Sequence, residues 1–117
     1  MKAEHFEDIL DEQVKRIRDV LVVKAAEYAT EDHLANFKKV AHLRGCGLPQ
    51  AVGGMMAKHT VSIFDMIESG REYPLEVWDE KITDHLNYLI LLRATLIENA
   101  GHAKLDRPVN LDQEPNA

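Results

Sequence analysis

The sequence predicts an all-α protein, a four-helix antiparallel bundle that we expect to be oligomeric. Apolar residues recur at three- and four-residue steps through four long segments, and no segment alternates apolar and polar residues as a strand would. Glycine or proline stands at the segment boundaries. A chain of 117 residues has room for one domain, which we expect over residues 1–101, followed by a polar tail over residues 102–117.

The first two helices are predicted from their apolar spacing and their flanking residues. The first runs from His5 to about Ala29 and begins among acidic residues, which the helix dipole favours. The second follows Thr30, a residue type that caps helix N-termini. It ends at Gly45, because glycine readily takes the left-handed conformation that closes a helix.

The third and fourth helices each begin beside a proline. Pro49 suits the first residue of the third helix, which Gly70 ends. Pro74 opens the fourth helix, which runs to Gly101 and carries an apolar stripe that includes Ile82, Leu89 and Leu96. From Leu86 to Ile97 this helix is apolar on nearly every side, so we expect a partner chain, most simply a second copy, to cover part of it.

Composition excludes several classes of protein. No apolar run is long enough to span a membrane, and the acidic, amphipathic start lacks the layout of a secretory signal, so we expect a cytoplasmic protein. The single cysteine, Cys46, rules out an internal disulfide. A net charge of −6 makes nucleic acid an unlikely partner.

Two acidic residues of the fourth helix are candidates for metal binding. Glu80 and Asp84 are four residues apart and therefore share a helix face. Like charges at this spacing repel, whereas Mg²⁺ accepts one or two carboxylates together with a substrate phosphate. A solvated acidic face near a helix N-terminus is the alternative. Lys58, on the third helix, suits either a phosphate or an acidic residue of a neighbouring helix.

Four short motifs resemble a known family. In order they are Lys24 with Glu27-Tyr28, Asn36-Phe37, Met55 to Lys58, and Glu80, Asp84 and Asn87-Tyr88 before an aliphatic run. Over residues 20–97 they are similar to the phage-associated nucleotide-modification-associated type-one domain, which is related to the all-α, MazG-like nucleoside triphosphate pyrophosphohydrolases. The chain lacks that group's pair of glutamates three residues apart on its middle helices.

The resemblance implies a nucleotide-binding protein, in its full form a Mg²⁺-dependent (deoxy)nucleoside triphosphate pyrophosphohydrolase. Glu27, Glu80 and Asp84 would be the catalytic and metal-binding residues. The substrate would be held by Lys24, Tyr28, Asn36, Lys58 and Asn87. The alternative is a non-catalytic helical module for oligomerisation or interaction. A helix-turn-helix around Gly45 is a distant third, because the helix that would read DNA offers a single lysine.

Overall fold

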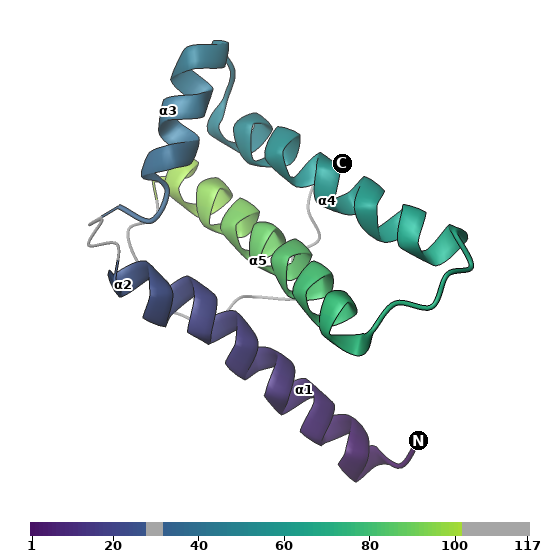
Figure 1. The fold of residues 1–117 in the computed structure, drawn as a ribbon. Coiled ribbons are helices and arrows are strands. Elements are labelled where there is room, and N and C mark those ends of the chain that lie inside the picture. The colour runs from purple at the N-terminus through teal and green to yellow at the C-terminus, as the bar shows by residue number, and fades with distance from the viewer. Residues whose placement is uncertain (28–31, 102–117) are drawn as a thin grey trace, which may run out of the picture.

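The computed structural model describes residues 1–27 and 32–101, and helices make up most of both ranges (Figure 1). The described ranges contain no strand, so the predicted all-α class is confirmed. The elements in chain order are α1 (Ala3–Arg18), the π-helix η1 (Asp19–Lys24), α2 (Ala25–Glu27), α3 (Ala35–Arg44), α4 (Leu48–Glu68) and α5 (Leu75–Asn99). No helix of the described ranges has the length and apolar character needed to cross a membrane.

The first helix is continuous from α1 through η1 to α2, close to its predicted extent. Its middle differs from the prediction, because residues Asp19–Lys24 form a π-helix with hydrogen bonds five residues apart. This segment contains three valines, whose β-branched side chains crowd the preceding turn of an α-helix.

The predicted boundaries around the third and fourth helices are confirmed to within two residues, whereas α3 begins at Ala35, later than a cap at Thr30 predicts, and residues 28–31 lie outside the described part of the chain. Gly45 caps α3 with a φ of 63°, and Gly70 follows α4 with a φ of 67°. Both are left-handed conformations that glycine adopts without steric strain. Pro49 lies in the first turn of α4, and Pro74 is the residue that immediately precedes α5.

Helix α5 lies between α1 and α4, while α3 lies near the C-terminal end of α5 (Figure 1). Helices α4 and α5 run in opposite directions and are joined by residues 69–74. Helix α1 crosses the N-terminal half of α5, where Gln13 Nε2 donates a hydrogen bond of 3.0 Å to Thr83 Oγ1. This crossing leaves a separate cleft on each of its two sides.

The apolar core is small and lies where α3, α4 and α5 meet. Leu34, Phe37 and Val52 are buried there, with Met55 and Tyr88 packed against them. No residue of α1 or η1 is fully buried. The first helix is therefore held to the body of the protein mainly along the strip that crosses α5.

The chain covers only part of the aliphatic stripe of α5. Ile82, Leu89 and Leu96 are exposed, whereas the buried residues of α5 are polar: Thr83, Asn87 and Thr95. Thr95 satisfies its hydroxyl by donating a hydrogen bond of 2.7 Å to the Leu92 carbonyl oxygen. Within the described residues, these three members of the expected core stripe thus face outward, whereas Leu92 of the same stripe packs against the core.

Candidate functional site

The strongest candidate site is a cleft of about 520 Å³ between the first helix and the N-terminal half of α5. We call it the acidic cleft because carboxylates dominate its lining. It brings together three residues that the sequence singled out, Lys24, Glu80 and Asp84. Its remaining lining residues are Arg16, Asp19, Val20, Glu76, Asp79 and Thr83.

Helical spacing explains how α5 supplies one wall of the acidic cleft. Glu76, Glu80 and Asp84 follow one another at four-residue steps and therefore form a stripe along one face of α5. Glu76 lies in the first turn, where the positive end of the helix dipole offsets part of the repulsion between these acids. The charges therefore gather at the end of α5 that tolerates them best.

The π-helix η1 supplies part of the opposite wall. Asp19 and Lys24 are five residues apart, which in an α-helix would separate their side chains by about 140° around the axis. In a π-helix, whose hydrogen bonds join residues five apart, such side chains lie about one turn apart on the same side of the helix. Both side chains consequently line the same cleft. The local geometry of η1 is thus what brings Lys24 to the acids of α5.

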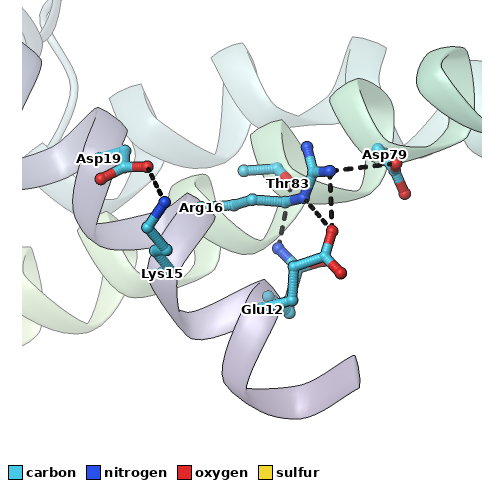
Figure 2. A network of polar contacts seen from close by, with 7 residues as sticks. Glu12, Lys15, Arg16, Asp19, Asp79 and Thr83 are labelled. Atoms are coloured by element: carbon cyan, nitrogen blue, oxygen red, sulfur yellow. Dashed lines mark hydrogen bonds and ion pairs between the residues drawn. The ribbon is translucent and has the colours of Figure 1, made fainter. Parts of the chain in front are cut away.

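Arg16 links the two walls (Figure 2). Its guanidinium donates hydrogen bonds of 3.1 and 2.9 Å to Glu12 and lies 3.4 Å from the carboxylate of Asp79 on α5. The hydrogen bond to Glu12, supported by the charge of Asp79, raises the pKa of Arg16, so it remains charged. Asp19 is paired at 3.9 Å with Lys15.

Three carboxylates of the acidic cleft remain uncompensated. Within residues 1–27 and 32–101, Glu76, Glu80 and Asp84 form no ion pair with a lysine or arginine. Glu76 and Glu80 are exposed, and Asp84 is half-buried. Additional positive charge at this place would therefore be favourable.

Asp84 also lies beside an aromatic contact between α4 and α5. His59 packs against the ring of Tyr88, with ring centroids 4.8 Å apart. Burial lowers the pKa of His59, and the negative charge of Asp84 opposes that shift in part. Next to it, His85 Nε2 and Thr60 Oγ1 are joined by a hydrogen bond of 2.9 Å.

Asn87 continues the stripe of Glu80 and Asp84 by one further turn. Its side chain is buried, with 5% of its surface exposed. Its Oδ1 atom accepts no hydrogen bond from any described residue. An unpaired buried acceptor costs roughly 1–3 kcal/mol, which makes Asn87 a strained neighbour of the acidic cleft.

The structure does not gather all the predicted site residues. Lys58 lines a different cleft of about 410 Å³ between α4 and α5, together with Ser62 and Lys81. The expectation that Lys58 shares a cleft with Glu80 and Asp84 was therefore wrong, because Lys58 projects from α4, whereas α1 covers the acidic face of α5.

The other predicted residues lie elsewhere or outside the description. Asn36 is exposed on α3. Glu27 is the last residue of α2, and its side chain lies outside the described part of the chain. Tyr28 also lies outside the described residues.

The donor set of the acidic cleft fits a hydrated magnesium ion rather than a closed protein cage. In residues 1–27 and 32–101, no three side chains of histidine, cysteine, aspartate or glutamate converge as a preformed metal site. Mg²⁺ keeps several water ligands and needs one or two carboxylates beside a substrate phosphate. Glu80 and Asp84, one helical turn apart, offer that pair.

Sequence reasoning missed four members of the acidic cleft: Arg16, Asp19, Glu76 and Asp79. The signal for the α5 members was present, since positions 76, 79, 80, 83 and 84 are all polar and follow helical spacing. The members from the first helix depend on the π-turn and on the crossing of α1 over α5.

No family model matches the chain, and neither the curated proteins nor the solved structures contain a match to it. The family resemblance of the motifs therefore stays a prediction. The arrangement of residues in the acidic cleft is the observation that bears on function.

Proposed function

We propose that the acidic cleft binds the phosphate groups of a nucleotide together with Mg²⁺. One observation carries this proposal: Lys24, Glu80 and Asp84, distant in sequence, line a single cleft. These residues supply the two kinds of group that a metal–phosphate complex needs, carboxylate oxygens for the cation and an ammonium for the phosphate.

The charge of the cleft supports a cationic ligand. Its lining includes five carboxylates but only two cationic side chains, Arg16 and Lys24. Arg16 is already engaged by Glu12 and Asp79. A divalent cation would offset the repulsion between Glu80 and Asp84, and it would also attract a phosphate that the acids alone would repel.

Each residue then has a defined role. Glu80 and Asp84 would hold Mg²⁺, with Glu27 as a third acid at the end of the first helix. Lys24 would neutralise phosphate oxygens. When bound, Mg²⁺ would supply charge neutralisation of the phosphates and a more acidic bound water, as pyrophosphohydrolysis requires.

The groups for the base and sugar are proposed from the resemblance. They are Asn36, Tyr28 and Asn87, of which only Asn87 is on the stripe of the acidic residues.

A thermal-shift measurement tests this function. The melting temperature of the wild-type protein is measured with Mg²⁺ alone, with dATP alone and with both together. A ligand that binds only the native state raises the free energy of unfolding by about 2.7 kcal/mol when its concentration is about 100 times its Kd. Asp84→Asn removes a metal charge at nearly constant shape and should abolish the shift. Glu68→Gln, an exposed acid at the end of α4, is the matched control and should retain it.

The proposal fails if no deoxynucleotide with Mg²⁺ raises the wild-type melting temperature. It also fails if the ligands raise the melting temperature of Asp84→Asn as much as that of the wild type. A second readout, release of pyrophosphate followed by ³¹P NMR with Glu27→Gln as the variant, separates hydrolysis from binding alone.

A second candidate function, a helical oligomerisation module, is favoured by a specific observation. Leu75, Ile82, Leu89 and Leu96 are all exposed and follow one another at seven-residue intervals along α5. A sustained seven-residue apolar repeat is typical of a helix that packs against another helix. A second copy would cover this stripe and complete an antiparallel four-helix bundle of the kind the sequence predicts. Light scattering that shows a monomer at micromolar concentration would contradict it.

A further inference from the structure

We infer that two copies of this chain form a dimer in which the N-terminal half of each α1 helix lies in an apolar groove of the other copy. This inference rests on the proposed homo-oligomer, but it places the interface at α1 and the groove beside it, not at the outer stripe of α5. It is independent of the acidic cleft, so the two proposals can fail separately.

The receiving surface is a groove of about 840 Å³ on the side of the α1–α5 crossing away from the acidic cleft. We call it the α1–α5 groove. Its walls are aliphatic, and they are formed by Val14, Ile17, Leu21, Ile90, Ala94 and Ile97. Charged residues stand at its rim, among them Arg18 and Glu98. A groove of this size and character accepts an apolar helix face.

The occupant is the part of α1 that the chain itself leaves uncovered. Phe6 is 59% exposed and Leu10 is 52% exposed, and Ile9 lies exposed beside them. Within the described residues, the side-chain hydrogen bonds and ion pairs between α1 and α5 begin only at Gln13. A packing partner would stabilise this part of the helix by removing its apolar side chains from water.

The exposed apolar residues of α1 and the α1 wall of the α1–α5 groove lie on one continuous face of the first helix. Phe6, Leu10 and Val14 follow at four-residue steps, and Ile17 and Leu21 extend the same face. If two such helices pack antiparallel about a twofold axis, Leu10 lies opposite the partner's Val14, and Phe6 lies level with the partner's Arg18 and next to the partner's Ile17. Both copies then make the same contact, as an isologous dimer requires.

Charge selects the antiparallel orientation. The N-terminal part of α1 is acidic and contains no lysine or arginine after the N-cap residue, Lys2. Its acidic residues are Glu4, Glu7, Asp8, Asp11 and Glu12. The last turn is basic, with Lys15, Arg16 and Arg18. An antiparallel pair places each acidic half against the partner's basic turn. A parallel pair would place acids against acids.

The interface leaves the acidic cleft open. That cleft is lined by Arg16, Val20 and Lys24 on one flank of the first helix, whereas Val14, Ile17 and Leu21 line the α1–α5 groove on the other. Variants of the groove-binding face can therefore be compared with the wild type for nucleotide binding without touching the proposed ligands.

Sedimentation equilibrium of the full chain tests the interface. The wild type is expected to be a dimer, and Leu10→Asp is expected to be a monomer with unchanged helical circular dichroism, since Leu10 is solvent-exposed within one copy. Leu43→Asp is the matched control, because Leu43 is 84% exposed on α3, away from the groove, and should remain dimeric. A monomeric wild type, or a dimeric Leu10→Asp, overturns the inference.

Charge reversal and cross-linking test the orientation. One variant carries Glu7→Lys and Asp11→Lys, and another carries Lys15→Glu and Arg18→Glu. Each alone should be monomeric, and an equimolar mixture should form heterodimers. In a Cys46→Ser background, a mixture of Leu10→Cys and Val14→Cys chains should form an interchain disulfide, while Phe6→Cys alone should not. Cross-linking of Phe6→Cys would indicate a parallel pair and overturn the proposed geometry.

One outcome would disprove the α1 interface and leave the homo-oligomer in place. If Leu89→Asp dissociates the dimer and Leu10→Asp does not, the outer face of α5 is the interface, and the α1 interface is wrong while the oligomer stands. The Mg²⁺–dATP thermal shift of the dissociated variant reports the nucleotide proposal independently.

Discussion

Asn87 is buried on α5 one turn beyond Asp84, and its Oδ1 atom has no donor among the described residues. We expect Asn87→Leu to leave the free energy of unfolding unchanged or to raise it, because the leucine removes an unpaired buried acceptor. Asn87→Asp should lower it by about 1–3 kcal/mol or more, since it buries a charge beside Asp84. Urea unfolding of both variants checks this, and a strongly destabilised Asn87→Leu would contradict it.

His59 should make stability depend on pH near neutrality. Burial lowers its pKa in the folded protein below the ordinary 6.5, so the unfolded chain binds the proton more readily. The charged groups that act on it are Asp84, Lys58, Lys81 and His85. His59 therefore lowers the free energy of unfolding as the pH falls below 6.5 and has no such effect above that value.

Replacing this histidine tests the sign of the effect. In His59→Gln, which cannot titrate, the fall in melting temperature between pH 7.5 and pH 5.5 should be smaller than in the wild type. An equal or larger fall would assign the pH dependence to other groups. The comparison uses the same buffer series for both proteins.

At the scale of residues, the sequence predicted the acidic pair and two candidate lysines, but not which of the two lysines lies beside the pair. Glu80 and Asp84 share a face by helical spacing alone, and they line one cleft. Whether Lys24 or Lys58 joins them depends on which helix covers that face of α5. Such a choice is made by tertiary packing, and local spacing holds no information about it.

At the scale of elements, two glycines should respond in opposite ways to alanine. Gly53 lies within α4 with open space where a Cβ would stand, so Gly53→Ala should raise the free energy of unfolding by roughly 0.5–1 kcal/mol. Gly70 also has open space but a φ of +67°, so Gly70→Ala should lower it by roughly 1–2 kcal/mol. Thermal melts of the two variants measure the contrast, and a stabilising Gly70→Ala would contradict the boundary assigned here.

The π-helix yields a second prediction at this scale. Deletion of Val23, an exposed residue of η1, should convert the segment into an ordinary α-helix. Asp19 and Lys24 would then be four residues apart in sequence and would still share a face. Helical circular dichroism and the Mg²⁺–dATP thermal shift should both be retained. Loss of helix would show that η1 is required for folding.

Helix limits were predictable because glycine and proline act locally. Gly45, Gly70 and Pro74 mark boundaries through backbone geometry that a single residue imposes. The π-turn was not predictable in this way. The apolar pattern of residues 20–23 suits an α-helix and a π-helix equally, and only the packing of this segment against α5 decides which charged residues share a cleft.

At the scale of the whole molecule, the all-α class followed from the periodicity, but the buried face of α5 did not. An apolar stripe indicates that one face of a helix is buried. It does not indicate whether the segment that buries it belongs to the same chain or to a partner chain. Here the chain covers the polar face of α5 with α1 and leaves Ile82 and Leu89 exposed. The proposed oligomer is what would reconcile the pattern with burial.

The central claim is that the acidic cleft binds Mg²⁺ with a nucleotide, and backbone amide NMR shifts measure its location directly. Adding Mg²⁺ and dATP to the ¹⁵N-labelled protein should move the amide signals of residues 19–24 and 76–84 most, with little change when either ligand is added to Asp84→Asn. An absence of shifts, or shifts confined to residues 58–66 beside the second cleft, would contradict the account.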